Sequence, residues 1–139
     1  MTVRPFNLQR LDHVVLRVRD MQNSLRFYTQ IVGCAIAKQR PDLGLVHLRA
    51  GASMIDLVDV NGVLGKKGGE APDPHRQNVD HVCLRIDPFN EEVLLTYLRS
   101  QGIDVEPAES RYGAEGDGPS IYFSDPDGNR VELKGPALD

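Results

Sequence analysis

The sequence has no tryptophan, two cysteines and little aromatic content, and these scarcities exclude whole classes of protein. Cys34 and Cys83 are widely separated and show no CxxC spacing, so we expect neither a disulfide scaffold nor a zinc finger. There is no apolar run of about 18 residues, the length that a membrane-spanning helix needs. Residues 1–10 lack the apolar stretch of a signal peptide. We therefore expect a cytoplasmic protein with two reduced thiols and no membrane partner.

The sequence also lacks an excess of basic residues. Lys and Arg number 16 against 20 Asp and Glu, which gives a net charge of −4. A surface for nucleic acid would need a basic excess, so a small molecule is the expected partner. At 139 residues, 40% of them hydrophobic, the chain is long enough to form one domain with a core of its own.

The most informative feature that is present is an internal repeat. The octapeptide LDHVVLRV at 11–18 returns as VDHVCLRI at 79–86, with Asp, His, Val, Leu and Arg identical and in register. In both copies the side chains alternate as in a strand, so that one face is apolar and the other carries the histidine.

A helical pattern follows each copy of the repeat. Asp20 is expected to cap a helix over 21–32 that ends at Gly33. After the second copy, Asp87 and Pro88 form the expected N-cap and first helical position of a helix that ends at Gly102.

Each helix leads into further strands, so the pattern predicts an α+β fold built from two βαβββ modules that form a curved mixed β-sheet. We expect a single domain over 1–139, made of a module at 10–60, a linker or mobile loop at 61–78 rich in Gly and Pro, and a module at 79–135. The expected later strands are 34–40, 45–50 and 53–60 in the first module and 103–108, 120–124 and 129–135 in the second.

Strand alternation places one titratable residue from each of four strands on the face away from the helices. These residues are His13, Asp56, His81 and Glu132. Two imidazoles and two carboxylates suit a divalent ion such as zinc, nickel, manganese or iron. Polar residues that simply face solvent satisfy the same alternation, so the residues alone leave the metal site as a hypothesis.

Further polar residues are expected beside this face. Ser120 and Tyr122 alternate with core residues, and Arg111 with the loop at 113–118 precedes their strand and is placed to close over a polar or anionic substrate. The alternative for this arginine is a rim or surface charge. By the same alternation, Arg17 and Arg85 lie on the ligand face or are surface charges. Cys83 lies beside His81, either as a reactive or ligating thiol or as a small apolar residue. His47 is a strand residue and His75 is a linker residue.

Three segments, LDHVVLRVRDMQNSLRFYTQIVG, VDHVCLRI and SIYFSDPDGNRVELKG, resemble the vicinal oxygen chelate superfamily, which includes glyoxalase I, the fosfomycin resistance proteins, extradiol dioxygenases and methylmalonyl-CoA epimerase. The resemblance covers nearly all of 10–135. It implies a glyoxalase/dioxygenase-like fold, a divalent metal ion held by His13, His81 and Glu132, and a homodimer whose sites draw ligands from two subunits. Asp56 stands where glyoxalase I-like members have Glu, and its side chain is shorter by about 1.5 Å, so its ligation requires a strand shift or a bridging water.

The resemblance further implies a glyoxalase I-like lyase, isomerase or transferase that chelates two neighbouring oxygens of a small metabolite and stabilises an anionic intermediate. Glu132 or Asp56 would be its catalytic base, with Tyr122, Ser120 and Arg111 at the substrate. Three alternatives stay open: a metal-free bleomycin-resistance-like binding protein, a fosfomycin-modifying thiol transferase and a small extradiol-type dioxygenase. Retention of both histidines and Glu132 argues against the first, and ring-cleaving members are generally longer than this chain.

Overall fold

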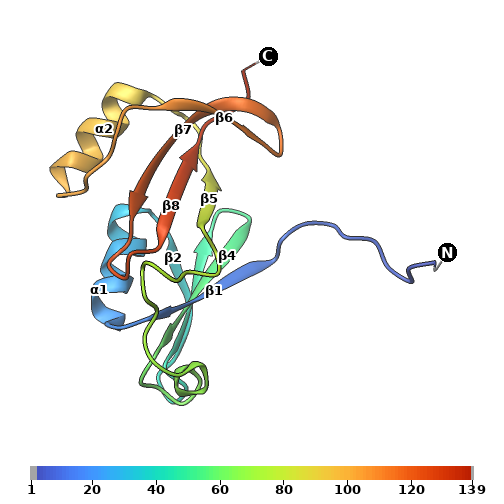
Figure 1. Ribbon diagram of the computed structural model, residues 1–139, viewed down its shortest axis with the longest axis vertical. Coiled ribbons are helices and arrows are strands. Elements are labelled where there is room, and N and C mark those ends of the chain that lie inside the picture. The colour runs from blue at the N-terminus through green and yellow to red at the C-terminus, as the bar shows by residue number, and fades with distance from the viewer. Residues whose placement is uncertain (1–2, 139) are drawn as a thin grey trace.

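The computed structural model describes residues 3–138 and contains two βαβββ units, as predicted (Figure 1). The first contains β1 (His13–Val18), α1 (Met21–Arg26) continuing as the π-helical turn η1 (Phe27–Ile31), β2 (Ala35–Arg40), β3 (Leu45–Ala50) and β4 (Ser53–Asp59). The second contains β5 (His81–Arg85), α2 (Glu91–Ser100), β6 (Glu109–Gly113), β7 (Gly116–Ser124) and β8 (Arg130–Lys134). None of the helices within 3–138 is long and apolar enough to span a membrane.

Each unit builds its own four-stranded mixed sheet, with strand orders β1-β4-β3-β2 and β5-β8-β7-β6. The first strand of each unit runs parallel to the last, and the other pairs are antiparallel. β1 and β5 therefore lie at sheet edges, and each pairs with a single strand of the described chain. This topology puts the two Asp-His repeats on exposed edges beside the strands that carry Asp56 and Glu132.

The helix boundaries agree with the sequence patterns except at the start of α2. The Asp20 side chain accepts from the backbone N–H of Asn23 at 3.0 Å, as expected of an N-cap. The prediction of an Asp87 N-cap was wrong, because Asn90 caps α2 and the cis Asp87–Pro88 peptide lies outside the helix. The Asn90 side chain accepts from the N–H of Val93 at 3.2 Å, which satisfies one of the free donors of the first turn.

Two expectations for the second unit were also wrong. Residues 103–108 form no strand, because side chains of α2 satisfy their backbone: Arg99 donates to the carbonyl of Val105, and Glu91 accepts from the N–H of Ala108. The predicted loop at 113–118 is instead a tight turn between β6 and β7, so that β7 begins four residues earlier than expected.

The segment at 61–78 is tied down rather than loose. It contains the 3-10 turn η2 (Gly65–Gly68), and the guanidinium of Arg17 donates to the carbonyls of Gly65 at 2.9 Å, Glu70 at 3.0 Å and Gly69. Arg19 donates to the carbonyl of Pro72 in the same way. The ligand-face arginine of β1 thus anchors the connection between the two units.

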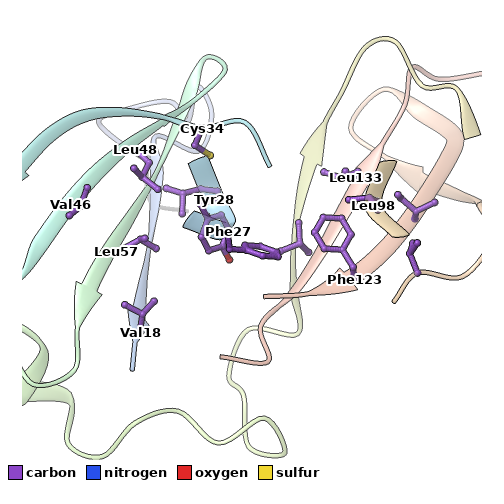
Figure 2. Close-up of a cluster of buried hydrophobic side chains, with 14 of the residues drawn as sticks. Val18, Phe27, Tyr28, Cys34, Val46, Leu48, Leu57, Leu98, Phe123 and Leu133 are labelled. Atoms are coloured by element: carbon purple, nitrogen blue, oxygen red, sulfur yellow. The ribbon is translucent and has the colours of Figure 1, made fainter. Parts of the chain in front are cut away.

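A single hydrophobic core spans both units (Figure 2). Its centre is Phe27 and Tyr28, which lie between Leu57 of the first sheet and Phe123 of the second. The rings of Phe27 and Phe123 are 5.9 Å apart, and the Tyr28 hydroxyl donates to Asp125 at 2.7 Å. Burial raises the pKa of Tyr28 well above its ordinary value, so this hydroxyl stays a donor. The helix-side faces are used for packing, which leaves the opposite face of each sheet, called here the site face, to polar side chains.

Candidate metal centre

The second unit brings two predicted ligands into direct contact. Cys83 of β5 lies opposite Glu132 of β8, and His81 lies two residues before Cys83 on the same face of the sheet. The Nε2 atom of His81 is 3.0 Å from Oε1 of Glu132, and Ser120 Oγ donates to Oε2 at 2.5 Å. Glu132 is only 4% exposed, so both of its oxygens are held in place inside the protein.

The carboxylate of Glu132 is kept ionised by its neighbours. Burial raises its pKa, but hydrogen bonds from Ser120 and Tyr122 and the charge of His81 outweigh burial, and the pKa lies below the ordinary value. The Cys83 thiol beside it shows the opposite behaviour, because burial and then the charge of Glu132 raise its pKa to about 11. At neutral pH this site therefore presents a carboxylate and a protonated thiol.

Both histidines of the repeat are oriented by the aspartate that precedes them. His13 Nδ1 is 2.7 Å from Asp12 Oδ1, and His81 Nδ1 is 2.8 Å from Asp80 Oδ1. The hydrogen bond to Asp12 raises the pKa of His13, with the charge of Asp56 a smaller contribution in the same direction. A carboxylate on one ring nitrogen fixes the tautomer that leaves the other nitrogen available to an ion. The Asp-His doublet in the sequence is the signal from which this orientation could have been predicted.

The first unit arranges the equivalent residues differently. Asp56 is 5% exposed, and its Oδ2 lies 3.0 Å from Nδ1 of His47, which stands directly opposite on β3. Its Oδ1 is buried and has no hydrogen-bond partner among residues 3–138. His47, which the sequence identified only as a strand residue, thus takes the carboxylate that was expected beside His13.

The described part of the chain gathers no group of three or more His, Cys, Asp or Glu able to hold a metal ion. The four predicted ligands are divided between the units, with His81 and Glu132 in contact and with His13 and Asp56 on the other sheet. A cavity of about 660 Å³ lies between the units and is lined by His13, Met54, Cys83 and Arg85 among mostly apolar neighbours. Each unit therefore holds two of the four predicted ligands, and each such pair is called here a half-site.

The predicted substrate residues lie around the half-site of the second unit. Tyr122 packs edge-on against His81 with ring centroids 5.5 Å apart, and the guanidinium groups of Arg130 and Arg111 lie 5.0 and 5.9 Å from its ring centre. Arg111 also donates to Glu109 at 2.5 Å and is exposed. Ser120 is 2% exposed and its hydroxyl is engaged by Glu132. Arg130 was not among the predicted site residues.

The chain thus consists of two βαβββ units, each with a histidine on its first strand and an acid on its last. A family model of the glyoxalase/bleomycin resistance protein/dioxygenase superfamily matches residues 10–133, and the chain belongs to this superfamily.

Individual relatives agree with this assignment. The chain is 32% identical over 128 residues to virulence protein STM3117 of Salmonella typhimurium, covering 91% of this chain and 83% of the relative. It is 27% identical over 135 residues to mitochondrial methylmalonyl-CoA epimerase of Bos taurus, covering 93% and 75%. An integron cassette protein of V. cholerae has a similar structure, with a TM-score of 0.73, 28% identity and coverage of 95% and 98%.

A more distant neighbour shares the fold at 19% identity, with a TM-score of 0.69 and coverage of 95% and 94%. It is a mutant of the fosfomycin resistance protein FosX from Listeria monocytogenes, complexed with Mn(II) and 1S,2S-dihydroxypropylphosphonic acid. Metal-bound members thus occur within this fold.

Proposed function

We propose that the protein is a metal-dependent, glyoxalase I-like enzyme of the vicinal oxygen chelate superfamily that acts on a small oxygenated metabolite. The observation that carries the proposal is the contact between His81 and Glu132, with Asp80 and Ser120 fixing the outer atoms of both side chains. A polar pair held on both sides is typical of a metal site, because ligands need a second layer of hydrogen bonds to keep their orientation.

In this proposal His13, His81 and Glu132 hold a divalent ion, and Asp56 is a fourth ligand. The buried oxygen of Asp56 that lacks a partner fits such a role, because an unpaired carboxylate oxygen in the interior is costly. Nδ1 of each histidine faces an aspartate, and Nε2 of His81 points at Glu132, the other proposed ligand of the second unit. Zinc, nickel, manganese and iron all accept imidazole and carboxylate ligands, and the manganese-bound relative supports an ion of this class.

The protein acts as a homodimer, in which the first unit of one copy completes the second unit of the other. The open edges of β1 and β5 support this arrangement, because unpaired strand edges invite pairing with another chain. The N-terminal segment leads away from both units (Figure 1), and it exposes Val3, Phe6, Leu8 and Leu11. Apolar side chains in that position favour burial against a second copy.

When bound, the ion would polarise two neighbouring oxygens of the substrate and stabilise negative charge on them. Glu132 accepts and returns the proton, since its pKa keeps it ionised and Ser120 fixes its orientation. Asp56, oriented by His47, is the alternative base. Tyr122 forms a wall beside His81, and Arg111 stands at the rim. Proton transfer next to chelated oxygens is lyase or isomerase chemistry, and the epimerase among the relatives supports the latter.

The proposal is tested by metal content. Wild-type protein loaded with manganese, nickel, zinc and iron(II) is expected to retain about one ion per chain by mass spectrometry, and His81→Ala is expected to lose it. His75→Ala, which changes an exposed histidine of the linker, is the matched control and should retain the metal. Equal loading of His81→Ala and wild-type protein would contradict the proposed ligand set and place the ion elsewhere on the chain. No loading of either would contradict the proposal and favour a metal-free binding protein.

A further inference from the structure

Lys134, the last residue of β8, is buried on the site face beside the candidate metal ligand. It is 6% exposed, and no described residue forms a hydrogen bond with its Nζ atom. Strand alternation places it on the same face as Glu132, two residues earlier. Lysine is rarely buried without a partner, since an ammonium group removed from water without compensation is strongly unfavourable.

Glycines of the neighbouring hairpin make room for this side chain. A Cβ atom at Gly113 would come within 2.7 Å of Lys134 Cε, and one at Gly118 within 2.8 Å of Nζ. Any larger residue at these two positions would have to displace the lysine. The hairpin between β6 and β7 is thus shaped around an ammonium group that has no hydrogen-bond partner among residues 3–138.

Three carboxylates of the second unit are engaged by groups other than Lys134, and the residues opposite Lys134 on the neighbouring strands are Arg85 and Ser120. Glu132 contacts His81 and Ser120, Glu109 accepts from Arg111, and Glu115 accepts from Arg85 at 2.6 Å. Lys134 is therefore a positive charge without a counter-ion among the described residues, in a protein whose net charge is −4. A negative group brought by a bound molecule would compensate this charge.

We propose that Lys134 binds an oxyanion carried by the substrate, a phosphate, phosphonate or carboxylate group, on the site face of the second unit. The inference rests on the proposed function and gives it a substrate class. The unbranched four-carbon side chain leaves the space beside Gly113 and Gly118 by rotation about its own bonds, and the ammonium then donates to the anion. Glu132, two residues earlier on β8, faces the reacting part of the same molecule.

The test measures binding of inorganic phosphate, methylphosphonate and acetate by calorimetry, with manganese-loaded and metal-free protein. Lys134→Gln is expected to weaken the preferred anion by about tenfold or more, the effect of losing one charge-assisted hydrogen bond. Lys67→Gln, which changes an exposed lysine of η2, is the matched control and should bind as wild type. The ranking of the three probes separates tetrahedral dianions from a planar carboxylate.

Thermal unfolding gives a second readout in case Lys134→Gln folds poorly. Without added anion, Lys134→Met is expected to raise Tm by a few degrees, because it removes an unpaired buried charge, and the anion should no longer shift its Tm. Unchanged anion binding in Lys134→Gln, or a Tm of Lys134→Met several degrees below wild type, would overturn the inference. Lys134-dependent binding in protein that retains no metal would contradict the proposed function and leave the anion site standing. Metal retention together with unchanged anion binding in Lys134→Gln would contradict the anion site and leave the proposed function standing.

Discussion

The two units share one pattern of strand pairing and use it differently. His13 and His81 begin equivalent strands, and Asp56 and Glu132 occupy equivalent positions on the strands beside them. Glu132 meets the histidine of its own repeat, whereas Asp56 meets His47 on the neighbouring antiparallel strand. Side-chain length explains the divergence, because glutamate has one more methylene with which to reach across the parallel pair.

This difference shows how a duplicated fold acquires two unlike halves. The second unit has a preformed His–Glu pair, and the position opposite its acid is Tyr122. The first unit has His47 at the corresponding position, and the acid pairs with His47 instead of with His13. Within the described residues neither half gathers three or more His, Cys, Asp or Glu that could hold an ion, so under the proposed function the halves are expected to work only in combination.

The strongest test of this complementarity mixes two inactive variants. His13→Ala and His81→Ala are each expected to retain almost no metal as homodimers. Unfolded together and refolded as an equal mixture, they should recover about a quarter of the wild-type sites, since half of the dimers are mixed and each has one intact site of two. Metal analysis after gel filtration measures the recovery.

Two controls sharpen this experiment. A mixture of His81→Ala and Glu132→Gln should recover nothing, because both changes fall in the same half. A mass near 15 kDa for wild-type protein by light scattering, or no recovery in the first mixture, would mean that the two halves of a site come from one chain.

The next largest effect concerns the core that joins the units. Phe27, which is 4% exposed, comes from the first unit and packs against Phe123 of the second. Phe27→Ala is expected to lower the free energy of unfolding by about 3–5 kcal/mol, as for other large buried aromatics. Tyr112→Ala, at a residue that is 84% exposed, should change it by less than about 0.5 kcal/mol. Urea titration measures both, and a separate transition for each unit in wild-type protein would contradict a common core.

The aspartates of the repeat offer a more finely matched comparison. Asp12→Asn and Asp80→Asn each remove the carboxylate that orients a histidine and should weaken metal binding by about 10–100-fold. Similar losses are expected in both, because both histidines serve one ion. Titration with a competing chelator measures the affinities, and Asp73→Asn in the linker is a suitable control. A loss confined to Asp80→Asn would indicate that His13 is not a ligand.

Much of this architecture could be predicted from the sequence because it follows from local periodicity. The repeated octapeptide, the Asp20 cap and the alternation around Glu132 each depend on neighbours in sequence, and the structure shows β1, β5, β8 and the cap where they were expected. The N-cap of α2 was misplaced because Asp87-Pro88 and Asn90 are both good signals, and the choice between them depends on how the chain enters the helix.

The partners of the site residues could not be predicted in the same way. Whether Asp56 meets His13 or His47 depends on side-chain reach across the sheet, and alternation alone does not distinguish the two. Burial of Lys134 depends on glycines in a hairpin that the sequence suggested was a loop. The fixing of the linker by Arg17 is likewise a contact between residues about 50 positions apart.

The smallest expected effect comes from removing the hydroxyl group that donates to Glu132, the acid of the second unit. Ser120→Ala removes the hydroxyl that donates to Glu132 and should destabilise chelator-treated protein by about 1.5 kcal/mol at neutral pH. Because the pKa of Glu132 is lowered in the folded state, this stability is present above the ordinary glutamate pKa and is lost as the pH falls through the lowered one. Without the Ser120 hydroxyl the pKa of Glu132 rises, so the variant should lose the contribution of Glu132 to stability at higher pH than wild type.

Tm measured from pH 7 to about pH 3 should therefore give curves for Ser120→Ala and wild type that converge in acid. Ser110→Ala, at an exposed serine of β6, should follow the wild-type curve throughout. Parallel curves for Ser120→Ala and wild type would show that the hydroxyl packs beside the carboxylate without holding its charge.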